Sequence, residues 1–187
     1  MWDAQNIEGQ VQMFLATMKS CRVWGRTLIL LAAVALAGCY PEYNWREIPV
    51  ADGLAVAAFP AKVNGQSRTI TLAGVDMEFT VESAWVDSSI FALGYARLPA
   101  DLSPGTRAAI RLEMTESLFR SLGEQPGKQA LKGETFVVVS QQSASPLRVV
   151  GRIVEHRDII VRMMASGPEQ ELSEQIGREF TGSLSLR

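Results

Sequence analysis

Apolar and polar residues alternate along much of the stretch between residues 54 and 98. The alternation is clearest where Val75, Met77, Phe79 and Val81 are separated by polar residues. A period of two is typical of a strand that turns one face to a core and the other to water. The pattern predicts four strands, at residues 54–59, 68–73, 75–82 and 90–98. Turns are predicted at residues 64–65 and 87–88.

The apolar period lengthens to four after residue 103. Ser103 and Pro104 suit the N-cap and the first turn of a helix, and apolar residues recur every four positions from Ile110 to Leu122. This predicts an amphipathic helix over residues 103–122. It is followed by a loop at residues 123–133, which is rich in glycine and contains a proline.

The rest of the chain predicts three more strands and a second helix. The strands are expected at residues 135–140, 147–155 and 159–165. Gly167 and Pro168 are predicted to open the helix, in which Leu172, Ile176 and Phe180 share one face until residue 182. The apolar tail at residues 184–186 is predicted to add to the sheet.

Strands that follow one another through short turns pair antiparallel, so the helices must cover the faces of a largely antiparallel sheet. The sequence therefore predicts the α+β class, as a single α/β/α-sandwich-like domain with two main helices over residues 53–187. This order of elements resembles the PsbP-like fold, a family that includes small bacterial lipoproteins. The resemblance spans residues 54–186 and rests on element order, without a diagnostic motif.

The first 38 residues have the pattern of an export signal. Lys19, Arg22 and Arg26 precede an apolar run of about 11 residues, which is too short for a helix that spans a bilayer, since that takes about 20 residues. Residues upstream of Met18 include acids that are atypical of such a signal. Met18 is therefore the expected true start, with Met13 as an alternative.

Leu36, Ala37, Gly38 and Cys39 resemble the lipobox of bacterial lipoproteins. The resemblance implies that the Cys39 thiol receives a diacylglyceryl group and that the signal is cut before it, leaving residues 39–52 as a lipidated tether. Residue 40 is not the Asp that favours retention at the inner membrane, so anchoring in the outer membrane, facing the periplasm, is expected. The alternatives are an ordinary secretory signal with a chance cysteine, or a buried apolar helix.

Charge and cysteine content narrow the function classes. The 187 residues hold 18 Lys and Arg and 20 Asp and Glu; without the first 38 residues these become 15 and 18, a formal net charge of −3. No basic run interleaved with aromatic residues is present, so nucleic acid is not an expected partner. The two cysteines, Cys21 and Cys39, leave no thiol for a disulfide or a thiolate metal site after residue 39.

No set of residues typical of an enzyme is found. The single histidine, His156, lies in the run Glu155 to Asp158, which the flanking strands predict to be a hairpin turn. The acids Asp76, Glu78 and Glu82 share one face of a strand, as expected of a solvated surface. No metal site and no cofactor is expected, apart from the covalent lipid on Cys39.

Two hypotheses for function remain after these exclusions. The first is a non-catalytic envelope lipoprotein, anchored in the membrane, that binds an as yet unknown protein partner or supports an assembly. The alternative is a periplasmic carrier of a small apolar or amphipathic ligand held between sheet and helix, with Trp85, Phe91 and Phe119 as lining. A deep pocket would favour the carrier, and a flat exposed apolar patch would favour the interaction module.

Overall fold

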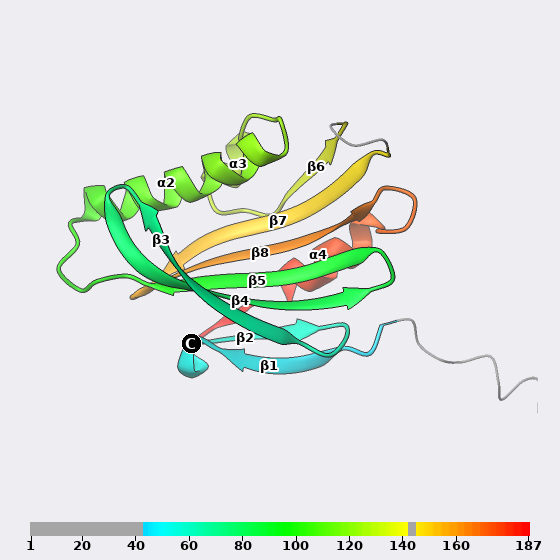
Figure 1. The fold of residues 1–187 in the computed structure, drawn as a ribbon, viewed down its shortest axis with the longest axis horizontal. Coiled ribbons are helices and arrows are strands. Elements are labelled where there is room, and N and C mark those ends of the chain that lie inside the picture. The colour runs from blue at the N-terminus through cyan, green and yellow to red at the C-terminus, as the bar shows by residue number, and fades with distance from the viewer. Residues whose placement is uncertain (1–42, 142–144) are drawn as a thin grey trace, which may run out of the picture. The chain divides into compact units, whose positions relative to one another are not determined.

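The computed structural model describes residues 43–141 and 145–187 of the chain, and these residues form two sheets and three helices (Figure 1). The larger sheet has six strands, in the order β3-β4-β5-β8-β7-β6. Their bounds are β3 Asn64–Leu72, β4 Val75–Val86, β5 Ser89–Arg97, β6 Phe136–Ser140, β7 Leu147–His156 and β8 Ile159–Pro168. The smaller sheet has the order β1-β2-β9, with β1 Arg46–Val50, β2 Ala55–Phe59 and β9 Ser185–Leu186.

All strand pairs are antiparallel, and two-residue turns join β3 to β4, β4 to β5 and β7 to β8. The β3–β4 turn has positive φ at both Ala73 and Gly74, as a tight hairpin requires. The β7–β8 turn is made by Arg157 and Asp158, so the predicted hairpin at this place is confirmed. The predicted α+β class with a largely antiparallel sheet is confirmed as well.

Helices and the small sheet cover the two faces of the large sheet. The α2 helix, Pro104–Ser121, and the short α3 helix, Lys128–Leu131, lie over one face, where Ile110, Phe119 and Phe136 belong to a shared core (Figure 1). The α4 helix, Glu174–Gly182, and the small sheet cover the other face, around Phe91 and Phe180. The sheet is thus buried on both sides by two separate apolar clusters.

The predicted α2 boundaries are confirmed. The hydroxyl oxygen of Ser103 accepts a hydrogen bond from the Thr106 backbone N–H at 3.1 Å, and Pro104 is the first helical residue. The second helix begins later than predicted, at Glu174, because residues 167–168 continue β8 and pair with β7. Ser173 provides the cap at this later start, with its hydroxyl 3.2 Å from the Ile176 N–H.

Two segments that were predicted as irregular are strands. Residues 46–50, within the predicted tether, pair with β2 as β1. Asn64 and Gly65, predicted as a turn, begin β3 and pair with Ser83 and Glu82. In both cases a partner strand distant from the local pattern supplies the hydrogen bonds that decide the conformation.

The small sheet is a further difference from the expected arrangement. The first predicted strand, residues 54–59, pairs with β1 and β9 and not with the large sheet. The apolar tail at residues 184–186 does add a strand, β9, which pairs with β2. The loop predicted at residues 123–133 contains the one-turn helix α3.

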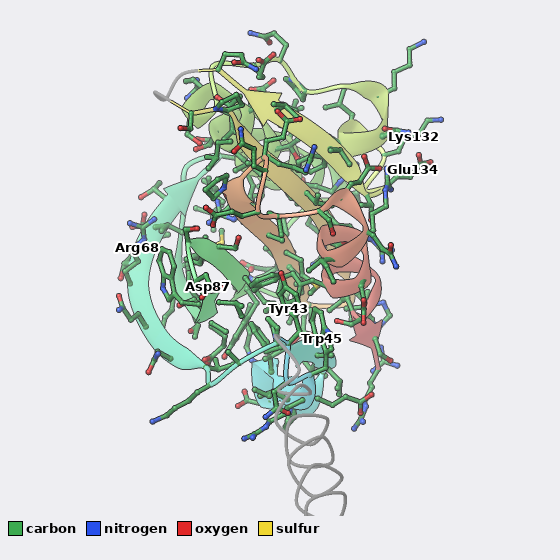
Figure 2. The ribbon with its side chains drawn as sticks, turned by 90° about the vertical axis from the view of Figure 1, so that its right-hand side faces the viewer. Tyr43, Trp45, Arg68, Asp87, Lys132 and Glu134 are labelled. Atoms are coloured by element: carbon green, nitrogen blue, oxygen red, sulfur yellow. The ribbon has the colours of Figure 1, made fainter. Side chains whose placement is uncertain are left out.

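Aromatic residues hold the start of the described chain against the domain. Tyr43 and Trp45, which are labelled in Figure 2, stack on each other with ring centroids 6.0 Å apart. Each of them meets the Phe91 ring edge-on at about 6 Å. The compact unit therefore begins at Tyr43, within the segment predicted as tether.

Candidate binding pocket

The residues predicted to carry the lipid lie outside the described part of the chain. Cys39 and the lipobox residues Leu36, Ala37 and Gly38 precede residue 43, so lipidation stays a prediction. No helix in the described ranges is long and apolar enough to cross a membrane.

His156 lies on β7, and the predicted acids Asp76, Glu78 and Glu82 lie on β4. His156 ends β7, and its Nε2 lies 3.2 Å from the backbone oxygen of Arg187. Asp76 and Glu78 are exposed, and Asp76 accepts a hydrogen bond from the Thr71 hydroxyl at 2.6 Å. The prediction that the β4 acids face solvent is confirmed for these two. In residues 43–141 and 145–187, no three His, Cys, Asp or Glu side chains gather as metal ligands would.

The three aromatic residues predicted to line a ligand site do not come together. Phe91 is fully buried in the cluster beneath α4, and Phe119 is 98% buried in the cluster beneath α2, on the opposite face of the sheet. Trp85 is 59% exposed. The proposed lining was therefore wrong, because alternation along β4 and β5 and the position of α2 send these side chains to three different environments.

A pocket of about 190 Å³ does lie between helix and sheet, at a different place from the one predicted. It is bounded by the edge strand β3, the neighbouring β4, the central strand β8 and the helix α2. Its lining is Arg68, Ile70, Thr71, Leu72, Phe79, Met114, Ser117 and Arg162. Small concave sites with apolar walls and a few polar groups are the usual form of a ligand site.

Arg162 is the unusual member of the lining. It belongs to β8, between Ile160 and Met164 on the same face, and both of these pack into the cluster beneath α2. Most of its side chain is buried. The guanidinium carbon lies 5.2 Å from the centroid of the Phe79 ring, a cation–π contact.

The Phe79 ring can lie beside Arg162 because position 94 has no side chain. Gly94 pairs with Arg162 across β5 and β8, and a Cβ built at Gly94 would come within 2.2 Å of the Phe79 ring. The ring thus occupies space over the sheet that any other residue at 94 would fill. Glycine, ring and guanidinium together form one wall of the pocket.

The electrostatic character of the pocket is positive. Arg68, on β3, is exposed (Figure 2). It lines the same pocket as Arg162. Burial, and to a smaller extent the charge of Arg68, lowers the pKa of Arg162 from its ordinary value. Arginine remains charged at neutral pH even so, and no Asp or Glu belongs to the lining.

Several other arginines of the described residues have partners within the fold. Arg107 pairs with Glu155 at 2.7 Å, Arg148 with Glu169 at 2.9 Å, and Arg97 with both Asp52 and Asp158. A second hollow, beside Arg111 and Glu155, is shallower, and its Arg111 guanidinium donates to the Leu131 carbonyl at 2.9 Å. These groups are engaged in holding the fold together.

Sequence reasoning missed Arg162, although the sequence carries a signal for it. Residues 159–165 read Ile-Ile-Val-Arg-Met-Met-Ala, a strand in which all residues except Arg162 are apolar. A continuously apolar strand is buried on both faces. One charged residue inside such a strand therefore points to a buried charge, which needs an explanation.

Comparisons with known proteins add little to this geometry. No family model and no curated protein matches the chain. Among solved structures, the chain is similar to the solution structure of cyanobacterial PsbP (CyanoP) from Synechocystis sp. PCC 6803, with 9% sequence identity and a TM-score of 0.44, over 80% of this chain and 96% of that chain. This name agrees with the PsbP-like resemblance of the element order, and at this similarity nothing about function is carried over.

Proposed function

We propose that the chain is a non-catalytic, membrane-anchored envelope lipoprotein whose domain binds a small amphipathic ligand in the pocket between α2 and the sheet. The observation that carries this proposal is the pocket itself, in which Ile70, Leu72 and Met114 provide apolar walls and two arginines provide polar ends. The exposed large apolar residues of the described chain lie on three different elements, namely Trp85, Leu112 and Leu131.

The size of the pocket limits the ligand. The pocket has a volume of about 190 Å³. Drug-sized ligands occupy pockets of about 300–1,000 Å³. The proposed ligand is therefore small, or it inserts only one end.

Ligand retention tests the proposal. Native mass spectrometry of the chain purified from membranes should show a bound small molecule, and Ser117→Phe, which places a ring at the pocket wall, should remove it. Ser117 is exposed on α2, so the fold should tolerate the change. Glu116→Phe is the matched control, because it adds the same ring to the same helix outside the pocket. Equal retention by both variants, or no ligand in the wild type, would contradict the proposal.

The membrane anchor is supported by the lipobox and has its own test. Cells grown with labelled palmitate should label the wild-type chain and not Cys39→Ser, and the variant should leave the membrane fraction. Because the compact unit begins at Tyr43, the four residue steps from Cys39 span at most about 14 Å. The domain would then be held close to the bilayer surface.

A protein-interaction role is the second candidate, and exposed Trp85 on β4 favours it. Tryptophan is enriched among the residues that dominate binding energy at interfaces. A partner recovered by the wild type from solubilised membranes should be lost with Trp85→Ser. A pull-down without a reproducible partner would count against this role and leave the ligand-binding role intact.

A further inference from the structure

We propose that the polar end of the ligand is an oxyanion, a carboxylate or a phosphate, which Arg162 and Arg68 bind together. This inference rests on the proposed ligand-binding function and names the class of ligand. The juxtaposition that carries it is one pocket lined by the mostly buried Arg162, by the exposed Arg68 and by apolar side chains.

The first step of the argument is the state of Arg162. Within residues 43–141 and 145–187, its guanidinium has no hydrogen bond or ion pair and touches the Phe79 ring instead. Burying a charge without a partner is costly, since the attraction to a ring replaces only part of the lost hydration. Replacing such a group by an apolar side chain is often neutral or stabilising. A free guanidinium at this place therefore suggests a partner from outside the chain.

The second step is the arrangement of charge. Arg68 brings a like charge to the same pocket, and the repulsion between the two guanidinium groups adds to the cost of burying Arg162. An anion between the two guanidinium groups would reverse the sign of both interactions. Two acids of the described residues bond to this edge of the sheet: Glu113 of α2 accepts a hydrogen bond from the Ala73 backbone N–H, and Asp76 of β4 accepts one from the Thr71 hydroxyl.

The third step is the geometry of a guanidinium. It presents five N–H donors in a planar fork, which matches carboxylate and phosphate oxygens in pairs. With one face of Arg162 toward the Phe79 ring, its edge remains for such bonding. Ile70, Leu72 and Met114 then provide an apolar surface for a short hydrocarbon portion of the ligand.

The variant Arg162→Met distinguishes a structural role of Arg162 from a role in anion binding, because the two roles predict opposite changes in melting temperature. If Arg162 stabilises the fold through Phe79, Arg162→Met should lower the melting temperature. If Arg162 is kept for an anion, Arg162→Met should raise the melting temperature of the ligand-free chain by about 2–4 °C, because an unpaired charge has been replaced by an apolar side chain. The same variant should lose its response to anions.

The test uses the full chain, purified in a detergent without an anionic head group, and four probes: hexanoate, hexyl phosphate, hexanol and inorganic phosphate. Hexanoate or hexyl phosphate, at about one hundred times its dissociation constant, should raise the wild-type melting temperature by about 5–10 °C. Arg162→Met and Arg68→Gln should each weaken that binding roughly ten- to hundred-fold. Arg46→Gln removes an exposed arginine from β1 and should have no effect.

The outcomes identify the kind of anion. They also test the anionic ligand separately from the ligand-binding function. Preference for hexanoate over hexyl phosphate indicates a carboxylate ligand, the reverse indicates a phosphate ester, and each of these results supports the inference. A response to inorganic phosphate alone would show a free ion without a hydrocarbon portion and would overturn the amphipathic ligand. Binding of hexanol that equals hexanoate and survives Arg162→Met would overturn the anion and leave the ligand-binding function standing. If no probe binds and no ligand is retained from cells, both fail.

Discussion

At the scale of single residues, Gly94 determines where the pocket wall can lie. A side chain there would come within 2.2 Å of the Phe79 ring, which itself lies 5.2 Å from the guanidinium of Arg162. Packing in a protein interior is dense enough that such an overlap displaces the ring. One glycine on β5 thereby positions a residue of β4 against a residue of β8.

Gly94→Ala is therefore expected to lower the free energy of unfolding by about 1–3 kcal/mol, the usual cost of overpacking. Urea denaturation measures this directly. Gly127→Ala is the matched control, because no atom lies within 4 Å of a Cβ at that position and its φ is −76°; it should change stability by less than about 0.5 kcal/mol. Equal losses in both variants would refute the packing argument.

At the scale of elements, α2 is the part that closes the pocket, through Met114 and Ser117. Its start is fixed locally by Ser103 and Pro104, whereas its face is fixed by the core residues beneath it. The start of α4 shows the contrary case, since pairing with β7 carries β8 as far as Pro168 and delays the helix to Glu174. In this domain a helix cap takes effect only after strand pairing has ended.

Removal of the α2 cap should weaken the fold. Ser103→Ala deletes the acceptor of the Thr106 N–H, which is 3.1 Å away, and should lower the free energy of unfolding by about 1 kcal/mol. Ser121→Ala, at the other end of the same helix, removes a hydroxyl that donates to the Leu118 carbonyl and should cost less than half as much. Thermal denaturation followed by circular dichroism compares the two, and equal losses would show that the cap is not decisive.

At the scale of the whole molecule, one sheet lies between two apolar clusters, and its strands contribute residues to both. β8 contributes Ile160 to the cluster beneath α2 and Ile159 to the cluster beneath α4. Every central strand has residues in both clusters. Disruption of one cluster therefore displaces strands that the other cluster also needs. The domain is expected to unfold as one cooperative unit.

Two mild core substitutions test this cooperativity. Ile110→Val, on the buried face of α2, and Ile159→Val, in the cluster beneath α4, each remove one buried methyl group and should each cost about 0.5–1.5 kcal/mol. In the double variant the costs should add to within about 0.5 kcal/mol, because the two residues share no cluster. Fluorescence and circular dichroism should give a single common transition in urea, and separate transitions would mean that the layers unfold independently.

Most strands and the first helix were predictable from local patterns. The predicted strands from β4 to β8 match the structure to within a few residues. Side-chain alternation indicated β4, whereas β8 was indicated by an apolar run that follows a turn. Ser103 and Pro104 placed α2 because capping involves only backbone within one turn. The tail at residues 184–186 was likewise expected to join a sheet, and it forms β9.

The site was not predictable in the same way. Trp85, Phe91 and Phe119 were expected to line a ligand site between sheet and helix, yet they lie in three environments. Arg162 and Arg68 are 94 positions apart in the sequence and line one pocket only because β3 and β8 belong to the same sheet and α2 crosses over them. Local periodicity carries no information about which strands become neighbours.

The sequence by itself determined the α+β class, the antiparallel hairpins and the start of α2, since each depends on side-chain alternation or capping within a few residues. It also determined the lipobox prediction, which rests on four consecutive residues. Only the tertiary structure decided that β1, β2 and β9 form a separate sheet and that two arginines face one apolar pocket. The physical reason is that hydrogen bonds between strands and the burial of charge depend on distant partners, which no local pattern identifies.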